Sequence, residues 1–359
     1  MRIAFDISPL SHAPRTGVPN YIRGSLAGLV AVAGAEHEIV PFAPTSLRGR
    51  RNLAEALAHV PVTTHVRWIP FAHAWRTAWS RAAWPPAERF LGAFDVLHFW
   101  DWMYPPQRAG VRATMIHDLV PLRFPQWTTR RTRAMHGAKY RNAARTCDVI
   151  FVNSRFTGRD VVELLDVPEK RVRIAHPGID REFVPDGARA DLGDPFVLAV
   201  ATSEPRKNLD TLLRAQPLLD PSLRLAVAGP SGWGPQVKLD HERVRALGYV
   251  EGESLARLYR GAEAFVFPSR FEGFGIPVLE AMASAVPTVV SSHPSLDEAA
   301  GDAAIRVDPD DPEAIAAGVE EAIRRRDELV QRGLAHTRQF SWEATGRAFL
   351  EGYLEHSAA

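Results

Sequence analysis

Short apolar runs alternate with segments of helical periodicity along almost the whole chain. Continuous apolar strands separated by helices indicate parallel sheets that are covered on both faces. The runs form two sets, and each set predicts a doubly wound α/β domain. In the first half the predicted strands are "RIAF", "HEIVPF", "DVLHF", "ATMIH" and "DVIFVN", and in the second half they are "FVLAVA", "LRLAVAG", "EAFVFP", "PTVVS" and "AIRV".

The boundary between the two domains is expected in "HPGIDREFVPDGARADLGDP", residues 176–195, which is rich in Gly, Pro and Asp and has no clear period. We therefore expect an N-terminal domain over 1–185, a second domain over 186–340, and an amphipathic helix over 341–359. Doubly wound sheets bind ligands at the carboxyl ends of their strands, so two such domains facing each other predict a shared cleft.

Composition narrows the class of protein. The 359 residues are 46% hydrophobic and 24% charged, as in soluble globular proteins, and the 43 basic and 42 acidic residues nearly cancel. This balance does not favour a nucleic-acid partner. The single cysteine, Cys147, excludes a disulfide framework and is expected in the core. No apolar run is long enough to span a bilayer, and Asp6 interrupts the first one, so we expect a cytoplasmic protein.

Polar residues follow two predicted strands of the first half. Gly17 and Pro19 come after the first strand and precede a helix predicted to begin near Asn20. A glycine there lets the backbone approach a ligand closely, although a simple tight turn explains it equally well. His117 and Asp118 end the strand "ATMIH". An imidazole at that place suits proton transfer or a hydrogen bond to a sugar hydroxyl.

A pair of cations follows the first strand of the second half. In "AVATSEPRKNLDTLLRA", Arg206 and Lys207 stand directly before an amphipathic helix. The alternative is a solvated helix start, but helix starts favour acids over bases. The pair therefore indicates an anion site, with phosphate as the expected ligand.

The stretch "RFEGFGIPVLEAMA" places a glycine-rich bend between two acids, Glu272 and Glu280. Gly273 and Gly275 relax the backbone so that amides can face a ligand, and Pro277 suits the first helical position. The helix start supplies a positive pole for phosphate. Both carboxylates can bind hydroxyls in one cleft, and the alternative is a capping acid followed by a solvated helix acid.

Two other stretches have a structural alternative that we favour. "DPD" at 308–310 matches the D-x-D of metal-dependent sugar transferases, but its surroundings predict the capped start of an exposed helix. No His/Cys cluster has metal spacing, so we expect neither a metal nor another cofactor. "HVRWIPFAHAWRTAWSRAAW" is either a surface for a membrane or a lipid-linked acceptor, or a helix packed on a sheet. A second basic cluster could support the membrane surface: Arg130, Arg131, Arg133, Lys139, Arg141 and Arg145.

The chain resembles the retaining GT-B glycosyltransferases of family four. The resemblance rests on "EPRKN", "LAVAGPSGWG", "ALGYVEGESLARLYRGAEAFVFPSRFEGFGIPVLEAMA", "NSRFTGRDVVELLDVP" and "HPGID", and it spans almost the whole chain. The spacing of Glu272 and Glu280 around G-F-G is specific in this context. It implies two Rossmann-like domains, a nucleotide sugar held mainly by the second, and a final helix that crosses back onto the first. Within the family, bacterial mannosyl- and rhamnosyltransferases of surface-polysaccharide assembly are the most similar.

The resemblance also implies roles for individual residues. Lys207 and Arg206 would bind the diphosphate, Glu272 the transferred sugar, and Glu280 the ribose hydroxyls. Many members carry an arginine where this chain has Ala201 and Thr202, so the phosphate site rests on Arg206 and Lys207. His117 would meet the sugar near the reacting carbon, and Gly17 the phosphates or the acceptor. The remaining donor contacts would come from Tyr249, Val250, Phe274, Gly275, Ile276 and Leu279.

The sequence therefore predicts a retaining, metal-independent hexosyltransferase. The donor is a nucleotide diphosphate sugar, with GDP-mannose the first choice, and the acceptor is a glycan, lipid-linked or small-molecule hydroxyl. Two alternatives stay open: a sugar-nucleotide epimerase on the same fold, and a sugar-nucleotide-binding protein without turnover. Peripheral membrane contact through the N-terminal domain also stays open.

Overall fold

The chain folds as two units, in a computed structural model that describes residues 1–12, 17–58, 60, 66–100, 104–230 and 242–357. Unit 1 contains Met1–Gly178 and Phe340–Ala359, and unit 2 contains Ile179–Gln339. Unit 2 begins before the expected residue 186 because the connecting segment packs on it. Phe183 lies edge-on to Tyr259, and Arg260 donates to the carbonyl oxygens of Glu182 and Ala188.

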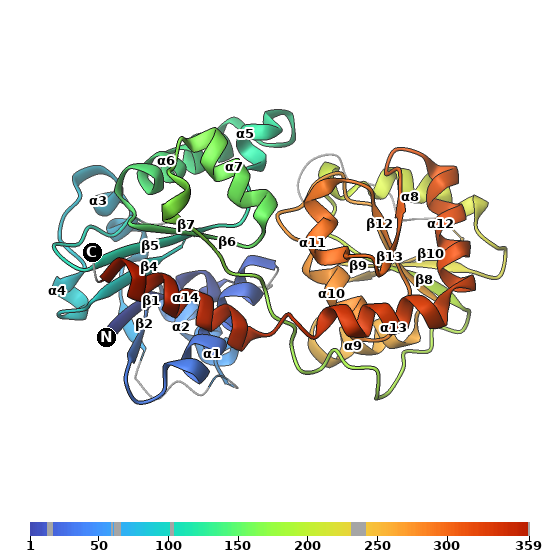
Figure 1. Cartoon of the computed structure of the whole chain (residues 1–359), viewed down its shortest axis with the longest axis horizontal. Helices are drawn as coiled ribbons and strands as arrows, with labels where there is room; N and C mark the ends of the chain where they lie inside the picture. The colour runs from blue at the N-terminus through green and yellow to red at the C-terminus, as the bar shows by residue number, and fades with distance from the viewer. Residues whose placement is uncertain (13–16, 59, 61–65, 101–103, 231–241, 358–359) are drawn as a thin grey trace. The chain divides into compact units, whose positions relative to one another are not determined.

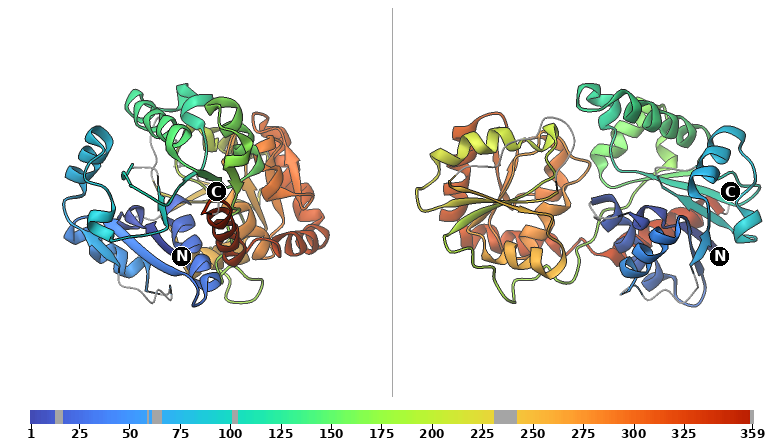
Figure 2. Two further views of the ribbon diagram at one scale, coloured as in Figure 1. Left: turned by 60° about the vertical axis from the view of Figure 1, so that its left-hand side comes forward. Right: turned by 180° about the vertical axis from the view of Figure 1, so that it is seen from behind.

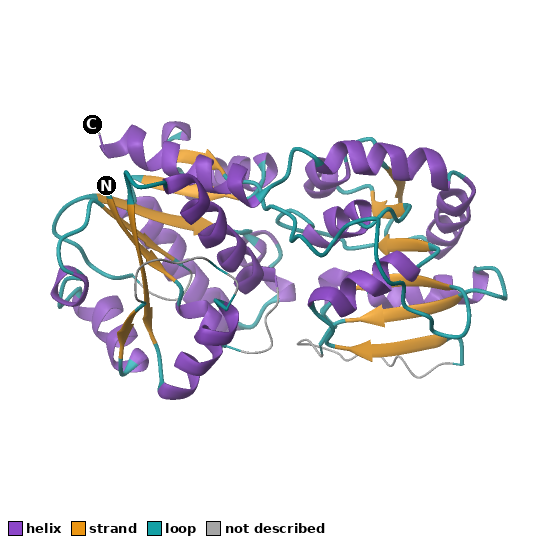
Figure 3. Cartoon of the chain, turned by 90° about the horizontal axis from the view of Figure 1, so that it is seen from below, coloured by secondary structure: helices purple, strands orange, loops and turns teal. Residues whose placement is uncertain are grey.

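Unit 1 is built on a seven-stranded parallel sheet of order β3-β2-β1-β4-β5-β6-β7. Helices lie on both sides of this sheet (Figures 1 and 3). The strands are β1 (Arg2–Asp6), β2 (Glu38–Pro44), β3 (Arg67–Ile69), β4 (Val96–Phe99), β5 (Val111–Ile116), β6 (Val149–Val152) and β7 (Val172–Ile174). The helices are α1 (Gly17–Ala33), α2 (Leu47–Ala56), α3 (Ala72–Ala82), α4 (Glu88–Leu91), α5 (Val120–Arg123), α6 (Arg130–Thr146), α7 (Arg155–Leu165) and α14 (Trp342–Ser357).

Unit 2 repeats this plan with six parallel strands of order β10-β9-β8-β11-β12-β13. This is the doubly wound order, in which the chain reverses its direction of growth between β8 and β11. The strands are β8 (Phe196–Val200), β9 (Arg224–Ala228), β10 (Val244–Gly248), β11 (Ala264–Phe267), β12 (Thr288–Ser291) and β13 (Ala304–Val307). The helices are α8 (Leu209–Ala215), α9 (Gly252–Gly261), α10 (Ile276–Ala283), α11 (Asp297–Ala300), α12 (Pro312–Arg324) and α13 (Arg326–Thr337).

The predicted fold class, two doubly wound parallel α/β sheets, is confirmed, and all ten predicted strands are present. The three strands that the pattern did not predict are β3, β7 and β10. Each lies at the edge of its sheet, and each carries an arginine. Edge strands are only partly covered, so they need no continuous apolar run.

The tryptophan- and arginine-rich region divides between core and surface. Trp79 is buried, and Trp75 packs against the same core cluster, as the helix interpretation predicted. Trp84 is 68% exposed.

Lys139 does not belong to a basic surface, because it is fully buried and donates to the Met115 carbonyl oxygen at 2.7 Å. Burial lowers the pKa of Lys139 to about 7. Cys147 is buried, as predicted.

None of the helices that the structure describes combines the length and the apolar character that crossing a bilayer requires.

The C-terminal helix α14 belongs to unit 1 and lies against α1 (Figures 1 and 2). Its Tyr353 is fully buried, and the Tyr353 hydroxyl lies 2.6 Å from His98 Nδ1. The two helix backbones approach closely because both carry glycine at the contact. A Cβ atom on Gly28 would lie 1.7 Å from the Trp342 carbonyl oxygen, and one on Gly346 would lie 2.4 Å from Gly28 C.

We expect Gly28→Ala to destabilise unit 1, because the added methyl group forces two helix backbones apart. Overpacking of this kind costs about 1–3 kcal/mol, which lowers the Tm by several degrees. The matched control is Gly17→Ala in the same helix, where no described atom lies within 4 Å of the new Cβ. Thermal unfolding of both variants measures the effect, and equal Tm values would contradict the close helix contact.

Candidate donor site of unit 2

Arg206 and Lys207 lie just beyond the carboxyl end of β8, in the short 3-10 turn Pro205–Lys207 that leads into α8. Asn208 ends the turn in a left-handed conformation, with φ 61°. Its side-chain amide donates to the carbonyl oxygens of Pro268 and Pro309 at 3.0 and 2.5 Å. The backbone that carries the two cations is therefore fixed to the segments that follow β11 and β13, as a preorganised ligand site requires.

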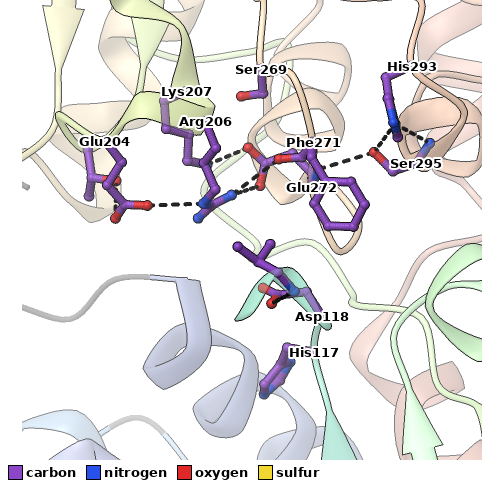
Figure 4. Close-up of polar contacts among 12 residues, drawn as sticks. His117, Asp118, Glu204, Arg206, Lys207, Ser269, Phe271, Glu272, His293 and Ser295 are labelled. Atoms are coloured by element: carbon purple, nitrogen blue, oxygen red, sulfur yellow. Dashed lines mark hydrogen bonds and ion pairs between the residues drawn. The ribbon is translucent and has the colours of Figure 1, made fainter. Parts of the chain in front are cut away.

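Glu272 joins the two cations. Its Oε2 lies 2.6 Å from Arg206 Nη1 and its Oε1 lies 2.7 Å from Lys207 Nζ (Figure 4). The side chains are only 8% exposed for Glu272, 18% for Arg206 and 11% for Lys207. Glu272 follows β11, which pairs with β8. The three charges therefore meet at the carboxyl ends of the two strands between which the sheet order reverses, where doubly wound folds bind ligands.

The electrostatics of the group follow from burial and pairing. Burial by itself would raise the pKa of Glu272, but Arg206 and Lys207 outweigh burial and lower it to about 2. Burial lowers the pKa of Lys207, an effect that Glu272 opposes. The carboxylate is ionised at neutral pH and holds two cations in a water-poor place.

A second acid that the sequence analysis did not single out also holds Arg206. Glu204 Oε2 accepts from Arg206 Nε at 3.0 Å (Figure 4). Glu204 Oε1 accepts from the Thr202 hydroxyl at 2.8 Å. Two carboxylates and two cations therefore form one charge-balanced cluster. The sequence could have indicated this role, because Glu204 stands two positions before Arg206 after the same predicted strand. Thr202, one of the two residues at the place where the family resemblance led us to expect an arginine, donates to Glu204 instead.

The backbone of Glu272 is held by a second loop. The amide of Glu272 donates to the Ser295 hydroxyl at 3.1 Å, and His293 Nδ1 lies 2.9 Å from the same oxygen (Figure 4). Ser295 is buried and follows β12, the next strand along the sheet. Sequence reasoning missed both residues. The signal was a polar cluster, "SSHPS", directly after a predicted strand.

The bend before α10 requires glycine at one position. Gly275 has a φ of 108°, and a Cβ there would lie 2.7 Å from Leu296 Cδ2. Ile276 is the first residue of α10 and Pro277 the second, one position later than predicted. Glycine carries no side chain that could cap the helix. Pro277 has no amide hydrogen and the Val278 amide donates to the Gly275 carbonyl oxygen at 3.0 Å, so the Ile276 amide is the group that the start of α10 offers to an anion. The predicted donor contacts of Phe274, Gly275 and Ile276 stay predictions.

Glu280 lies on α10 and is half-buried. Its Oε2 accepts from the Tyr259 hydroxyl at 3.0 Å, which orients the carboxylate. Leu279 is fully buried in the core, and Tyr249 donates to Glu251 at 2.5 Å. The predicted roles of Glu280, Leu279, Tyr249 and neighbouring Val250 in donor binding stay predictions.

His117 belongs to unit 1 and lies at the carboxyl end of β5. Its ring stacks on Trp100 at 5.8 Å between centroids and meets Tyr21 edge-on at 5.1 Å. Burial lowers the pKa of His117 to about 4, so the imidazole is neutral at pH 7. Neutrality favours the hydrogen-bonding role over proton transfer near neutral pH. Within the described residues, His117 Nε2 has no hydrogen-bond partner.

Two further predictions concern helix starts. Helix α1 begins at Gly17 rather than near Asn20, so Gly17 is its first residue, and the loop residues 13–16 before it lie outside the described part of the chain. The "DPD" stretch is part of a capped helix start, as predicted. Asp311 caps α12 by accepting from the amides of Glu313 and Ala314. Asp310 pairs with Arg270 at 2.8 Å.

Glu272 makes the stability of unit 2 depend on pH. Its folded pKa, about 2, lies below the usual 4.5, so its stabilisation is present above pH 4.5 and is lost as the pH falls toward 2. The shift corresponds to about 3 kcal/mol at pH 7. Glu272→Gln should therefore unfold more easily than wild type at pH 7, and the difference should shrink between pH 5 and pH 2. The exposed Glu320→Gln is the control. A difference in unfolding free energy that does not change with pH would contradict the pairing.

Family models match both units. A model described as Glycosyltransferase Family 4 matches residues 15–183, and one described as Glycosyl transferases group 1 matches residues 194–325. Of the motif "LAVAGPSGWG", which lies in the second match, residues 231–234 are outside the described part of the chain.

Two relatives illustrate the similarity to named glycosyltransferases. The chain is 29% identical to O-antigen chain mannosyltransferase B of Escherichia coli, over 96% of this chain and 97% of that protein. It is 34% identical to D-inositol 3-phosphate glycosyltransferase of Mycolicibacterium smegmatis, over 57% of this chain and 52% of that protein.

Solved structures share the fold. Sucrose-phosphate synthase of Thermosynechococcus elongatus superposes with a TM-score of 0.69 at 18% identity, covering 99% of this chain and 98% of that one. The Anabaena protein HepE in complex with UDP and glucose superposes with a TM-score of 0.68 at 13% identity, covering 98% of each chain. The two family matches and the two doubly wound sheets agree, and the chain belongs to the glycosyltransferases of group 1 and family 4, with the GT-B fold.

Proposed function

We propose that this glycosyltransferase is a retaining, metal-independent hexosyltransferase. It moves a sugar, with mannose the first choice, from a nucleotide diphosphate to a hydroxyl of a glycan, lipid-linked or small-molecule acceptor. The observation that carries the proposal is the buried cation pair of Arg206 and Lys207 beside the start of α10. The names of the relatives support mannose, because several of them are called mannosyltransferases. The single, buried cysteine is consistent with a cytoplasmic location.

The cations would act on the leaving group. As the bond between the sugar and the diphosphate breaks, negative charge grows on the departing phosphate oxygen. Arg206, Lys207 and the start of α10 are already fixed in place, so they would stabilise this charge without reorganisation. In a retaining transfer the new bond to the acceptor oxygen forms on the face that the diphosphate leaves, and the departing phosphate oxygen would take the proton of the acceptor hydroxyl. Positive charge from the protein is thus proposed to serve where a metal ion serves in other transferases.

Glu272 would change partners when the donor binds. In this structure its carboxylate occupies both cations, and an incoming diphosphate would compete for the same N–H groups. The exchange would leave the carboxylate to accept hydrogen bonds from sugar hydroxyls and to favour positive charge at the anomeric carbon. Glu280 would hold the ribose, with Tyr249 and Val250 near the base. His117 would hydrogen-bond the sugar, and Gly17 would meet the phosphates or the acceptor.

A donor screen without divalent metal tests the proposal. Thermal unfolding is recorded with a panel of nucleotide sugars in chelator, and turnover is then assayed with the donor that binds. A ligand at about 100 times its Kd stabilises the folded state by about 2.7 kcal/mol, so the true donor should raise the Tm clearly. We expect GDP-mannose to give the largest rise and turnover to persist in chelator. An epimerised nucleotide sugar formed without acceptor, or full and reversible loss of turnover in chelator, would overturn the proposal.

Glu272→Gln should separate sugar binding from phosphate binding. The change keeps the size of the side chain but removes a charge-assisted acceptor worth about 1.5–3 kcal/mol, so turnover should fall at least about tenfold. Affinity for the bare nucleotide diphosphate should stay the same or increase, because no carboxylate competes for the cations.

Lys207→Ala is the contrasting variant, and the exposed Lys170→Ala is the control. Lys207→Ala should weaken the bare nucleotide diphosphate and lower turnover by about 100-fold, as the loss of one preorganised donor does. Titration calorimetry and initial rates measure both effects. A Glu272→Gln variant that loses affinity for the bare nucleotide, or keeps its full rate, would refute the assignment of Glu272 to the sugar.

A further inference from the structure

Unit 1 contains a cavity of about 1000 Å³ at the carboxyl ends of its first three strands. Three connections line it. Ser11 and His12 follow β1, residues 44–49 run from the end of β2 into α2, and Trp68 of β3 is followed by residues 70–72, which lead into α3. In open parallel sheets this edge is where ligands bind. The residues discussed above for the donor do not line this cavity.

The cavity presents large apolar side chains to solvent. Leu47 is 71% exposed at the start of α2, and Phe71 is 76% exposed directly before α3. Trp68 also lines the cavity and is half-buried. Phe71 has a φ of 61°, a backbone angle that residues other than glycine rarely adopt. Folding normally buries such side chains, as it does with nearby Trp79, so their gathering at one cavity indicates an apolar ligand.

Several polar groups of the lining are already used inside the protein. Asn52 Nδ2 donates to the Ser11 carbonyl oxygen at 2.9 Å, and the Ser46 hydroxyl accepts from the Gly49 amide at 3.1 Å. Trp68 Nε1 donates to the Thr45 carbonyl oxygen at 3.1 Å. A site for a sugar needs many hydrogen-bonding groups directed at the ligand, and these groups are directed at the protein instead. An apolar occupant fits the lining better than a sugar.

The same cavity is basic at its rim. Arg48 lines it from the first turn of α2 and is exposed, and Arg50 lies over the Trp68 ring at 5.4 Å. The first turn of α2 contains no acid, so the partial positive charge of the helix start adds to that of the arginines. Guanidinium groups at a helix start favour phosphate. The occupant therefore combines an apolar part with an anionic one.

We infer that this cavity holds the non-sugar end of the acceptor, an alkyl or isoprenyl chain joined through phosphate to the sugar that is extended. The chain would lie against Leu47, Trp68 and Phe71, and the phosphate would pair with Arg48. The inference rests on the proposed function and selects the lipid-linked class among its three acceptor classes. A bilayer surface and a lipid-free glycan are the competing occupants.

Binding of octyl phosphate below its micellar concentration tests the inference with the full chain. By titration calorimetry, octyl phosphate should bind at least about tenfold more tightly than inorganic phosphate or 1-octanol, because each probe lacks one of the two contacts. The double variant Leu47→Ser/Phe71→Ser and the single variant Arg48→Gln should each weaken octyl phosphate by about tenfold or more. All these side chains are exposed, so the Tm should not change.

Two matched controls make the test specific. Leu164→Ser removes a leucine that is 43% exposed on α7, and Arg51→Gln removes an arginine of α2 that does not line the cavity. Both should bind octyl phosphate as wild type does. The inference is overturned if the cavity variants bind like the controls. It is also overturned if the protein binds anionic phosphatidylglycerol vesicles but not monomeric octyl phosphate, or if a lipid-free oligosaccharide is the probe that the cavity variants lose.

The donor screen keeps this test separate from the proposed function. The cavity residues belong to unit 1 and the cation pair to unit 2, so the cavity variants should keep the wild-type thermal shift with the nucleotide sugar. Loss of octyl phosphate binding with an intact donor shift supports the inference. A wild-type protein that binds octyl phosphate but no nucleotide sugar would refute the proposed function alone.

Discussion

The contact of one buried carboxylate with two cations is the interaction on which the donor site depends. Arg206 and Lys207 would repel each other in a water-poor place, and Glu272 balances them at 2.6 and 2.7 Å. Removing one partner of such a buried group leaves an uncompensated charge, which costs several kcal/mol. The sheet order makes the contact available, because β8 and β11 are neighbours and parallel strands end at the same edge. The fold thus brings together residues that are 65 positions apart.

The same geometric rule organises unit 1. His117 follows β5, and the apolar cavity lies beyond β1, β2 and β3, so the distinctive polar and apolar groups gather at one edge of that sheet. The packing of the helices behind this edge depends on glycine. Gly28 and Gly346 let α1 and α14 touch through their backbones, and the last helix of the chain thereby becomes part of unit 1. Loops at the sheet edge can then vary in chemistry while the layers behind them stay close-packed.

The sequence was sufficient for the elements whose signal is local. Central strands are buried on both faces, so their apolar runs were readable, whereas the edge strands β3, β7 and β10 carry arginine and were not. Arg206, Lys207 and Glu272 were predicted as separate groups, but their mutual contact depends on which strands are neighbours. Glu204 and Ser295 escaped notice because their role is to hold other site residues. Burial also changed the expected chemistry of His117, whose pKa of about 4 no single stretch of sequence reveals.

Under the proposed function, the pairing of Glu272 with Arg206 and Lys207 would also affect release of the nucleotide diphosphate product. Without Glu272, Arg206 and Lys207 would bind the nucleotide diphosphate product tightly, and tight product binding slows release. Glu272 competes for the same N–H groups, so its return to Arg206 and Lys207 would favour departure of the product. The carboxylate would then stabilise the transition state while the sugar is bound. After the sugar has been transferred, it would promote release of the nucleotide diphosphate. Tight binding raises the rate only where it favours the transition state over the other bound states. Glu272 would therefore help turnover if it weakens binding of the product more than binding of the transition state.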